Sequence, residues 1–211
     1  MSSTLTSHTA ERSRPSRLLI MGPPGSGKRT QGVTLAQRLE VPSLSTGDLF
    51  RAMMCYDTQV AARLRDTVGH GGYVDDYTTN AAIDQRLDAP ECRDGFLLYG
   101  YPRTAAQAAH LDDLLAGQGA RLDAVVCLEV GDDELIYRLV ARERQLGRID
   151  DQYENLRPKL ALYRQKTEPL VELYRDRGLL VQVDGTGTVR QVTERIDALL
   201  ERGSTTAGVA G

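Results

Sequence analysis

A glycine-rich segment at residues 22–31, Gly-Pro-Pro-Gly-Ser-Gly-Lys-Arg-Thr-Gln, has the residue types and the spacing that suit an anionic ligand. Gly25 and Gly27 allow the backbone to bend so that successive N–H groups point at one anion, and Lys28 adds a compact positive charge. An apolar run at residues 18–21 precedes the segment, and apolar residues at helical spacing follow it. The order strand, loop, helix predicts a loop that binds the phosphates of a nucleotide.

This loop departs by one position from the strict phosphate-loop pattern G-x-x-x-x-G-K-[ST]. Arg29 stands where the hydroxyl residue belongs, and the hydroxyl comes one residue later, at Thr30. A glycine loop after a strand is also compatible with a plain tight turn, but the helix that follows favours phosphate binding. The residues predicted to contact the phosphates are Gly25, Ser26, Gly27, Lys28, Arg29 and Thr30.

Length and composition limit the class of protein. The chain has 211 residues and a formal net charge of −3, which allows one compact domain and argues against nucleic acid as a partner. No apolar run approaches the ~20 residues of a membrane span, and residues 1–15 lack the apolar centre of a signal peptide. We expect a cytoplasmic protein without a membrane partner. The three cysteines and three histidines are isolated, so no disulfide, metal ligand or catalytic base is assigned to them.

Short apolar runs alternate with helical patterns along the chain, which predicts an α/β protein with a parallel sheet. The runs expected to form strands are 17–21, 95–99, 124–130 and 179–183. Apolar spacing over 160–173 predicts one long helix. A terminal helix is expected to begin after Thr188, because Gln191 lies at capping-box spacing from it. The tails at 1–15 and 203–211 are expected to be disordered.

Two further motifs are expected at the carboxyl ends of strands, where open parallel sheets bind their ligands. Residues 45–51 read Ser-Thr-Gly-Asp-Leu-Phe-Arg, and residues 95–103 read Gly-Phe-Leu-Leu-Tyr-Gly-Tyr-Pro-Arg. With these motifs the chain resembles the adenylate kinase family of nucleoside monophosphate kinases, whose signatures are G-x-P-G-x-G-K-G-T-Q, S-T-G-D-[LM]-[LF]-R and D-G-[FY]-P-R. The resemblance extends over residues 17–202.

The resemblance implies a P-loop NTPase fold, with a central parallel sheet flanked by helices, in a kinase domain at residues 16–202. Within it, the resemblance implies an acceptor-binding helical segment at 45–75 and a short lid at 142–157. The implied reaction is the reversible transfer of a phosphoryl group from ATP, with Mg²⁺, to AMP, which gives two ADP. The family also implies a monomer whose partners are small nucleotides.

Matching positions imply a role for individual residues. The residues placed at the transferring phosphoryl group are Lys28, Arg103, Arg138, Arg148 and Lys159. ATP is assigned the loop residues together with Arg138 and Arg142. AMP is assigned Thr46, Arg51, Gly71, Val74, Gly100, Arg103, Gln107, Arg148 and Lys159. Thr46 and Gln107 favour adenine as the base, and no protein ligand to a metal is assigned. Any one of these arginines also suits a solvated surface, but their joint placement beside matched motifs favours phosphate binding.

Three positions depart from the family's pattern. Tyr99 replaces the aspartate that orders water around Mg²⁺, and a neutral phenol offers the metal no charge. Arg29 replaces a glycine, and Lys159, preceded by Pro158, replaces an arginine. We therefore expect a slow kinase. Two alternatives stay open: a nucleotide-binding regulatory protein with little or no catalysis, and a kinase for a different nucleoside monophosphate.

Overall fold

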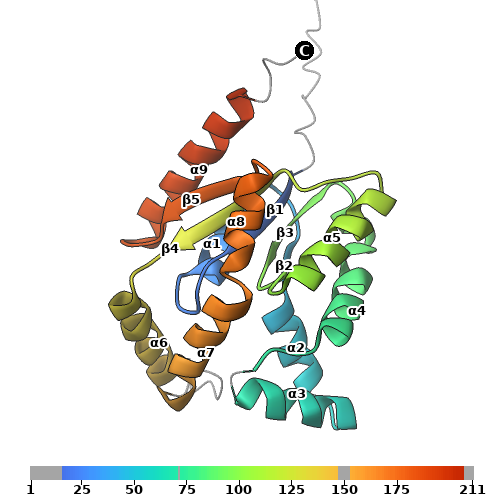
Figure 1. Cartoon of the computed structure of the whole chain (residues 1–211), viewed down its shortest axis with the longest axis vertical. Coiled ribbons are helices and arrows are strands. Elements are labelled where there is room, and N and C mark those ends of the chain that lie inside the picture. Colours follow the sequence, from blue (N-terminus) through green and yellow to red (C-terminus); the bar gives the residue numbers. More distant parts are fainter. Residues whose placement is uncertain (1–15, 71, 147–152, 207–211) are drawn as a thin grey trace, which may run out of the picture.

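The computed structural model describes residues 16–70, 72–146 and 153–206. Within these residues, parallel strands form one sheet in the order β2-β3-β1-β4-β5 (Figure 1). Their bounds are Ser16–Met21 (β1), Ser43–Ser45 (β2), Gly95–Tyr99 (β3), Ala124–Glu129 (β4) and Leu180–Asp184 (β5). The predicted parallel α/β fold is confirmed, and the four predicted strands begin and end within one residue of their expected positions. The three-residue strand β2 is an addition to the prediction.

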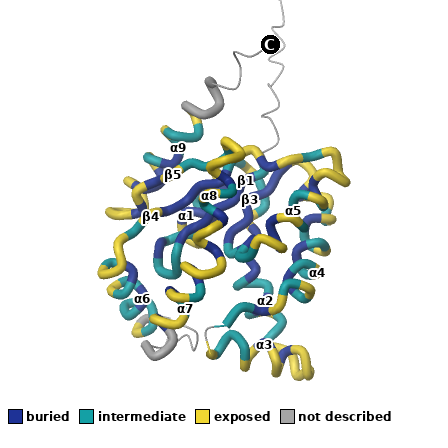
Figure 2. The backbone as a smooth tube through the Cα atoms, in the orientation of Figure 1, coloured by how far each residue is buried: buried dark blue, intermediate teal, exposed yellow. Residues whose placement is uncertain are grey.

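Helices cover both faces of this sheet. Their bounds are Lys28–Arg38 (α1), Thr46–Met54 (α2), Gln59–Gly69 (α3), Asp76–Leu87 (α4), Ala105–Gly117 (α5), Asp132–Leu146 (α6), Tyr153–Lys166 (α7), Pro169–Asp176 (α8) and Val189–Thr206 (α9), with a 3₁₀ turn at Pro90–Cys92 (η1). Helices α1 and α9 pack on one face, and α4, α5 and α8 pack on the other. Because side chains alternate across a strand, Leu18 and Leu19 of β1 enter opposite cores. Figure 2 shows the central strands β1, β3 and β4 buried between these two layers.

Helix α9 begins as predicted. The Gln191 side chain accepts a hydrogen bond from the Thr188 backbone N–H at 2.9 Å, and the Thr188 hydroxyl accepts one from the Gln191 N–H at 3.3 Å. This reciprocal pair is a capping box. The helix continues to Thr206, four residues past the boundary expected at Arg202. None of the helices in the described ranges is long and apolar enough to span a membrane.

The prediction of one long helix over 160–173 is wrong. Helix α7 ends at Lys166 and α8 begins at Pro169. Proline has no backbone N–H to donate within a helix, and it is tolerated in the first turn, where that donor has no helical partner, so a helix boundary at Pro169 has a local cause. Pro158, by contrast, lies inside α7.

Two helical segments extend from the same end of the sheet, at the bottom of Figure 1. Helices α2 and α3 belong to the expected acceptor segment, and they have a small core of their own formed by Phe50, Leu64 and Val74. On the other side stand α6 and α7. The expected lid at 142–157 comprises the end of α6 and the start of α7, and residues 147–152 between them lie outside the described residues.

Candidate functional site

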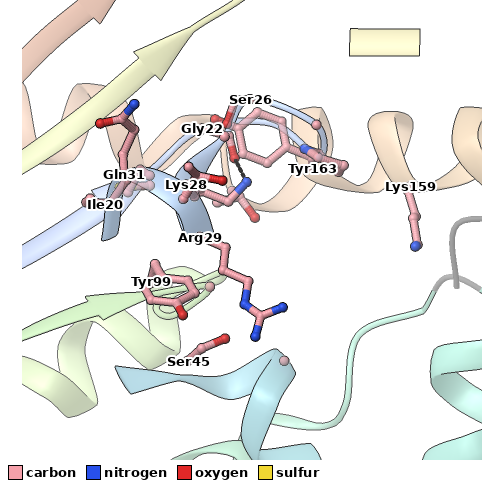
Figure 3. A pocket seen from close by; sticks show the side chains of 18 of the residues that line it. Ile20, Gly22, Ser26, Lys28, Arg29, Gln31, Ser45, Tyr99, Lys159 and Tyr163 are labelled. Carbon is pink, nitrogen blue, oxygen red and sulfur yellow. Dashed lines mark hydrogen bonds between the residues drawn. The ribbon is translucent and has the colours of Figure 1, made fainter. Parts of the chain in front are cut away.

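A cavity of about 650 Å³ opens at the carboxyl ends of the strands, between the glycine loop, α2 and α7 (Figure 3). Most of the predicted site residues meet in its wall. They are Gly25, Ser26, Gly27, Lys28, Arg29, Thr30, Arg51, Val74, Gly100, Arg103, Arg138, Arg142 and Lys159. These residues come from segments far apart in the sequence, and the parallel sheet brings them to one edge.

Two of the predicted acceptor residues are placed behind this wall. The Thr46 hydroxyl donates to the Gly100 carbonyl at 2.8 Å, and Gln107 accepts from the Arg103 backbone N–H at 2.7 Å. Both side chains are buried and neither lines the cavity, so in this structure they position Gly100 and Arg103. Their contact with a base stays a prediction.

The predicted residues Gly71 and Arg148 lie outside the described residues. So does the acidic pair Asp150 and Asp151, which follows Arg148 in the sequence.

The glycine loop has the backbone that an anion site needs. Gly25 and Gly27 have φ values of 85° and 95°, a region that side chains disfavour, and Gly27 caps the start of α1. The Ser26 hydroxyl is buried and has no hydrogen-bond partner among the described residues. A buried donor without a partner is costly, so Ser26 is suited to a polar atom of a ligand.

Lys28 folds back over this loop. Its ammonium group donates to the carbonyls of Gly22 and Pro23 at 2.6 and 2.7 Å (Figure 3). Burial, followed by the positive charges of Arg103 and Arg142, lowers the pKa of Lys28 to about 7. The lysine is therefore poised between its charged and neutral forms near neutral pH.

This pKa predicts that phosphate binding takes up a proton. A bound anion favours the charged lysine and raises its pKa, so above pH ~7 binding must protonate Lys28, and affinity falls by up to about tenfold per pH unit. Calorimetry of ATP binding near pH ~8, in two buffers of different ionisation enthalpy, measures the uptake. We expect the parent to take up nearly one proton per ATP bound and Lys28→Met to take up none. The ATP phosphates titrate in the same way in both experiments. Equal uptake by the two proteins would contradict this assignment.

Arginines gather around the rest of the cavity. Arg103 Nε donates to the Gly100 carbonyl at 2.7 Å, and its Cζ lies over the Tyr73 ring, 4.6 Å from the ring centroid. Arg138 donates to Glu134 at 2.7 Å and to the Gly185 carbonyl at 3.1 Å. Glu134 is the one carboxylate in the described part of the cavity wall. The excess of positive charge suits a ligand with several phosphate groups.

Tyr99 belongs to a polar cluster that motif analysis missed. Its hydroxyl donates to one carboxylate oxygen of Asp48 at 3.2 Å, and the Arg29 Nε lies 3.4 Å from the same oxygen. Arg51 donates to the other oxygen at 2.6 Å. Burial opposes ionisation of Asp48, but the hydrogen bond and charge of Arg51, together with the charge of Arg29, hold its pKa below the ordinary value. Burial, then the nearby Asp48 charge, raises the pKa of Tyr99, so its phenol is neutral at neutral pH.

Helix α1 makes room for the Tyr99 ring. A Cβ added at Gly32 would lie 2.7 Å from Tyr99 Cδ1 and 3.2 Å from Leu97 Cδ2. Glycine in a helix interior costs about 1 kcal/mol relative to alanine. The structure therefore gives this glycine a steric reason: the closest contacts are with the Tyr99 ring, whereas the Leu97 methyl group lies at the end of a flexible side chain that can shift.

The effect of Gly32→Ala on the free energy of unfolding is expected to change sign with residue 99. In the parent the new methyl group collides with the ring, and overpacking costs about 1–3 kcal/mol. In a Tyr99→Ala background the ring is gone, and the same change is expected to stabilise by up to about 1 kcal/mol through helix propensity. Urea unfolding of the four proteins tests the coupling, and effects of the same sign in both backgrounds would count against it.

Comparison with known proteins agrees with this geometry. A family model described as "Adenylate kinase" matches residues 20–179. The chain is 46% identical over 184 residues to the adenylate kinase of Clavibacter michiganensis subsp. michiganensis, covering 87% of this chain and 92% of the relative. It is 45% identical to those of a Nocardioides species and of Kocuria rhizophila, over 88% of this chain and 97% and 99% of the relatives.

Proposed function

Because the chain belongs to the adenylate kinase family, we propose that it catalyses the reversible transfer of a phosphoryl group from ATP to AMP, which gives two ADP. The family shows an enzyme of the nucleoside monophosphate kinase type with a P-loop NTPase fold. The observation that carries the proposal for this chain is the convergence of Lys28, Arg51, Arg103 and Arg138 on one cavity. Phosphoryl transfer needs positioning and charge stabilisation more than covalent chemistry, and this cavity supplies both.

We assign the donor and the acceptor to opposite sides of the cavity. The glycine loop and Lys28 bind the ATP phosphates, and Lys28 exchanges its loop carbonyl partners for phosphate oxygens. Arg51 and Arg103 hold the AMP phosphate through forked hydrogen bonds. An oxygen of that phosphate attacks the γ-phosphorus, and the bond from the γ-phosphorus to the β–γ bridging oxygen breaks, so ADP leaves on the donor side.

In this proposal the side of the cavity formed by α6 and α7 closes over the transferred group. Arg138 and Arg142 of α6 and Lys159 of α7 line the cavity. We assign them, with Arg148, to the transferring phosphoryl group, and we assign residues 142–157 to a short lid and 45–75 to the acceptor segment. Closure excludes water, which otherwise hydrolyses the γ-phosphate.

The donor set does not fit a protein-held Mg²⁺. Among the described residues of the cavity wall, Glu134 is the one carboxylate, and Arg138 already binds it. Mg²⁺ is a hard cation that prefers oxygen ligands and retains several waters, so it enters here as part of the magnesium–ATP substrate. Bound to the phosphates, it neutralises part of their charge.

The test is ADP formation by the purified chain from magnesium–ATP and AMP, measured by separation of the nucleotides. We expect ADP to form, at a rate reduced by the absence of the aspartate at position 99. We also expect the protein to be a monomer that acts in the cytoplasm. No ADP, with ATP binding intact, would reject the kinase in favour of a nucleotide-binding regulatory protein. Faster turnover of UMP, CMP or GMP than of AMP would reject AMP as the acceptor.

A further inference from the structure

Four side chains form what we call the junction cluster: Arg29, Asp48, Arg51 and Tyr99. It lies where the glycine loop and α1 meet the start of α2, so it joins the donor side of the cavity to the acceptor side. Two guanidinium groups and one carboxylate, with a neutral phenol, leave a net charge of one positive unit. An aspartate in place of Tyr99 would bring this sum to zero.

Arg29 is held at one edge and open at the other. Its Nε faces Asp48 at 3.4 Å, and its side chain is 54% exposed and lines the cavity. Figure 3 shows its two terminal nitrogens directed away from Tyr99 into the cavity. These nitrogens belong to the planar fork that matches two phosphate oxygens.

Tyr99 contributes to this arrangement through its shape and its neutrality. Its hydroxyl donates to the oxygen of Asp48 that also faces Arg29, so the carboxylate is fixed from a second direction. The ring occupies the space that Gly32 leaves open on α1. Tyr99 thus positions the Asp48 carboxylate, which in turn faces Arg29.

We propose that Arg29, oriented by Asp48 and Tyr99, binds the phosphates between donor and acceptor and takes over part of the charge neutralisation that Mg²⁺ supplies. This inference rests on the proposed function. Two cations at the same phosphates repel each other, so Mg²⁺ adds less to the affinity for the nucleotide where Arg29 is present. Without Mg²⁺, Arg29 still holds the nucleotide. Nucleotide binding by this chain therefore depends little on Mg²⁺.

The test compares ATP dissociation constants measured by calorimetry with excess Mg²⁺ and with a chelator. For the parent we expect the two constants to agree within about threefold, and for Arg29→Met we expect their ratio to grow by about tenfold, as for loss of a charge-assisted hydrogen bond. Arg38→Met is the matched control, because Arg38 lies on the same helix with the same 54% exposure and pairs with Asp197, away from the cavity. Its ratio is expected to equal that of the parent.

Tyr99→Phe tests the positioning role. The variant keeps the ring that packs against Gly32 and loses the hydroxyl, with its hydrogen bonds to Asp48 and Ser43, so a change in its ratio does not come from lost packing. We expect a ratio between those of the parent and Arg29→Met, with an unchanged melting temperature.

An Arg29→Met ratio equal to that of the parent would overturn the proposal, as would a parent that fails to bind ATP without Mg²⁺. These ratios are measured without turnover. Absence of ADP formation with the expected ratios would therefore reject the kinase and retain Arg29 as a phosphate ligand, whereas ADP formation with equal ratios would reject Arg29 alone.

Discussion

Lys28→Met is expected to lower the rate of ADP formation by at least about a thousandfold. The Lys28 ammonium group lies inside the glycine loop, with its Nζ 2.6 Å from the Gly22 carbonyl oxygen. Burial there lowers its pKa to about 7. In such a site, a charge that meets the developing negative charge of the transition state contributes about 3–4 kcal/mol or more. Methionine keeps the length and packing of the stem, so the loss isolates the charge.

The measurement is the steady-state rate with saturating magnesium–ATP and AMP, together with the unfolding midpoint of each protein. Lys166→Met is the control, since Lys166 is an exposed lysine at the end of α7 and does not line the cavity. We expect it to match the parent. A Lys28→Met variant that folds and keeps more than about a tenth of the parent rate would remove Lys28 from the catalytic machinery.

The features that the sequence predicted are those set by local chemistry. The glycine loop, the strands buried on both faces and the capping box at Thr188 each depend on residues that are neighbours in the chain. The positions of Lys28, Arg51 and Arg103 at one edge then follow from the rule that parallel strands align their carboxyl ends. This explains why much of the cavity wall was predictable.

The junction cluster and the seat of Tyr99 were not predictable in this way. Tyr99 and Asp48 are 51 residues apart, and their hydrogen bond depends on how far α2 stands from β3. Gly32 carries no motif, and its meaning is visible only when a Cβ is found to collide with the Tyr99 ring. The strand β2 has three residues, too few for a periodic signal, and it is recognised by its pairing with β3.

Tyr99→Asp is expected to raise the rate of ADP formation with Mg²⁺ by about a hundredfold. The family pattern has an aspartate here, and one well-placed charge in phosphoryl transfer contributes on the order of 3 kcal/mol. Tyr99 lines the cavity beside Asp48 and Arg29, so we expect the new carboxylate to add there the negative charge that the water shell of Mg²⁺ requires. It also cancels the positive charge of the junction cluster, so the gain should vanish without Mg²⁺.

Tyr99→Asn separates the charge from the removal of the ring. Asparagine has nearly the shape of aspartate and leaves the same space beside Gly32, but it carries no charge. We expect its rate to stay within about threefold of the parent. If asparagine accelerates the reaction as much as aspartate does, the handicap of the parent is the bulk of the tyrosine ring. If neither variant is faster, Arg29 already compensates for the missing carboxylate. The double variant Arg29→Gly with Tyr99→Asp is then expected to be faster than the parent, because it restores both family residues where the two phosphate sites meet.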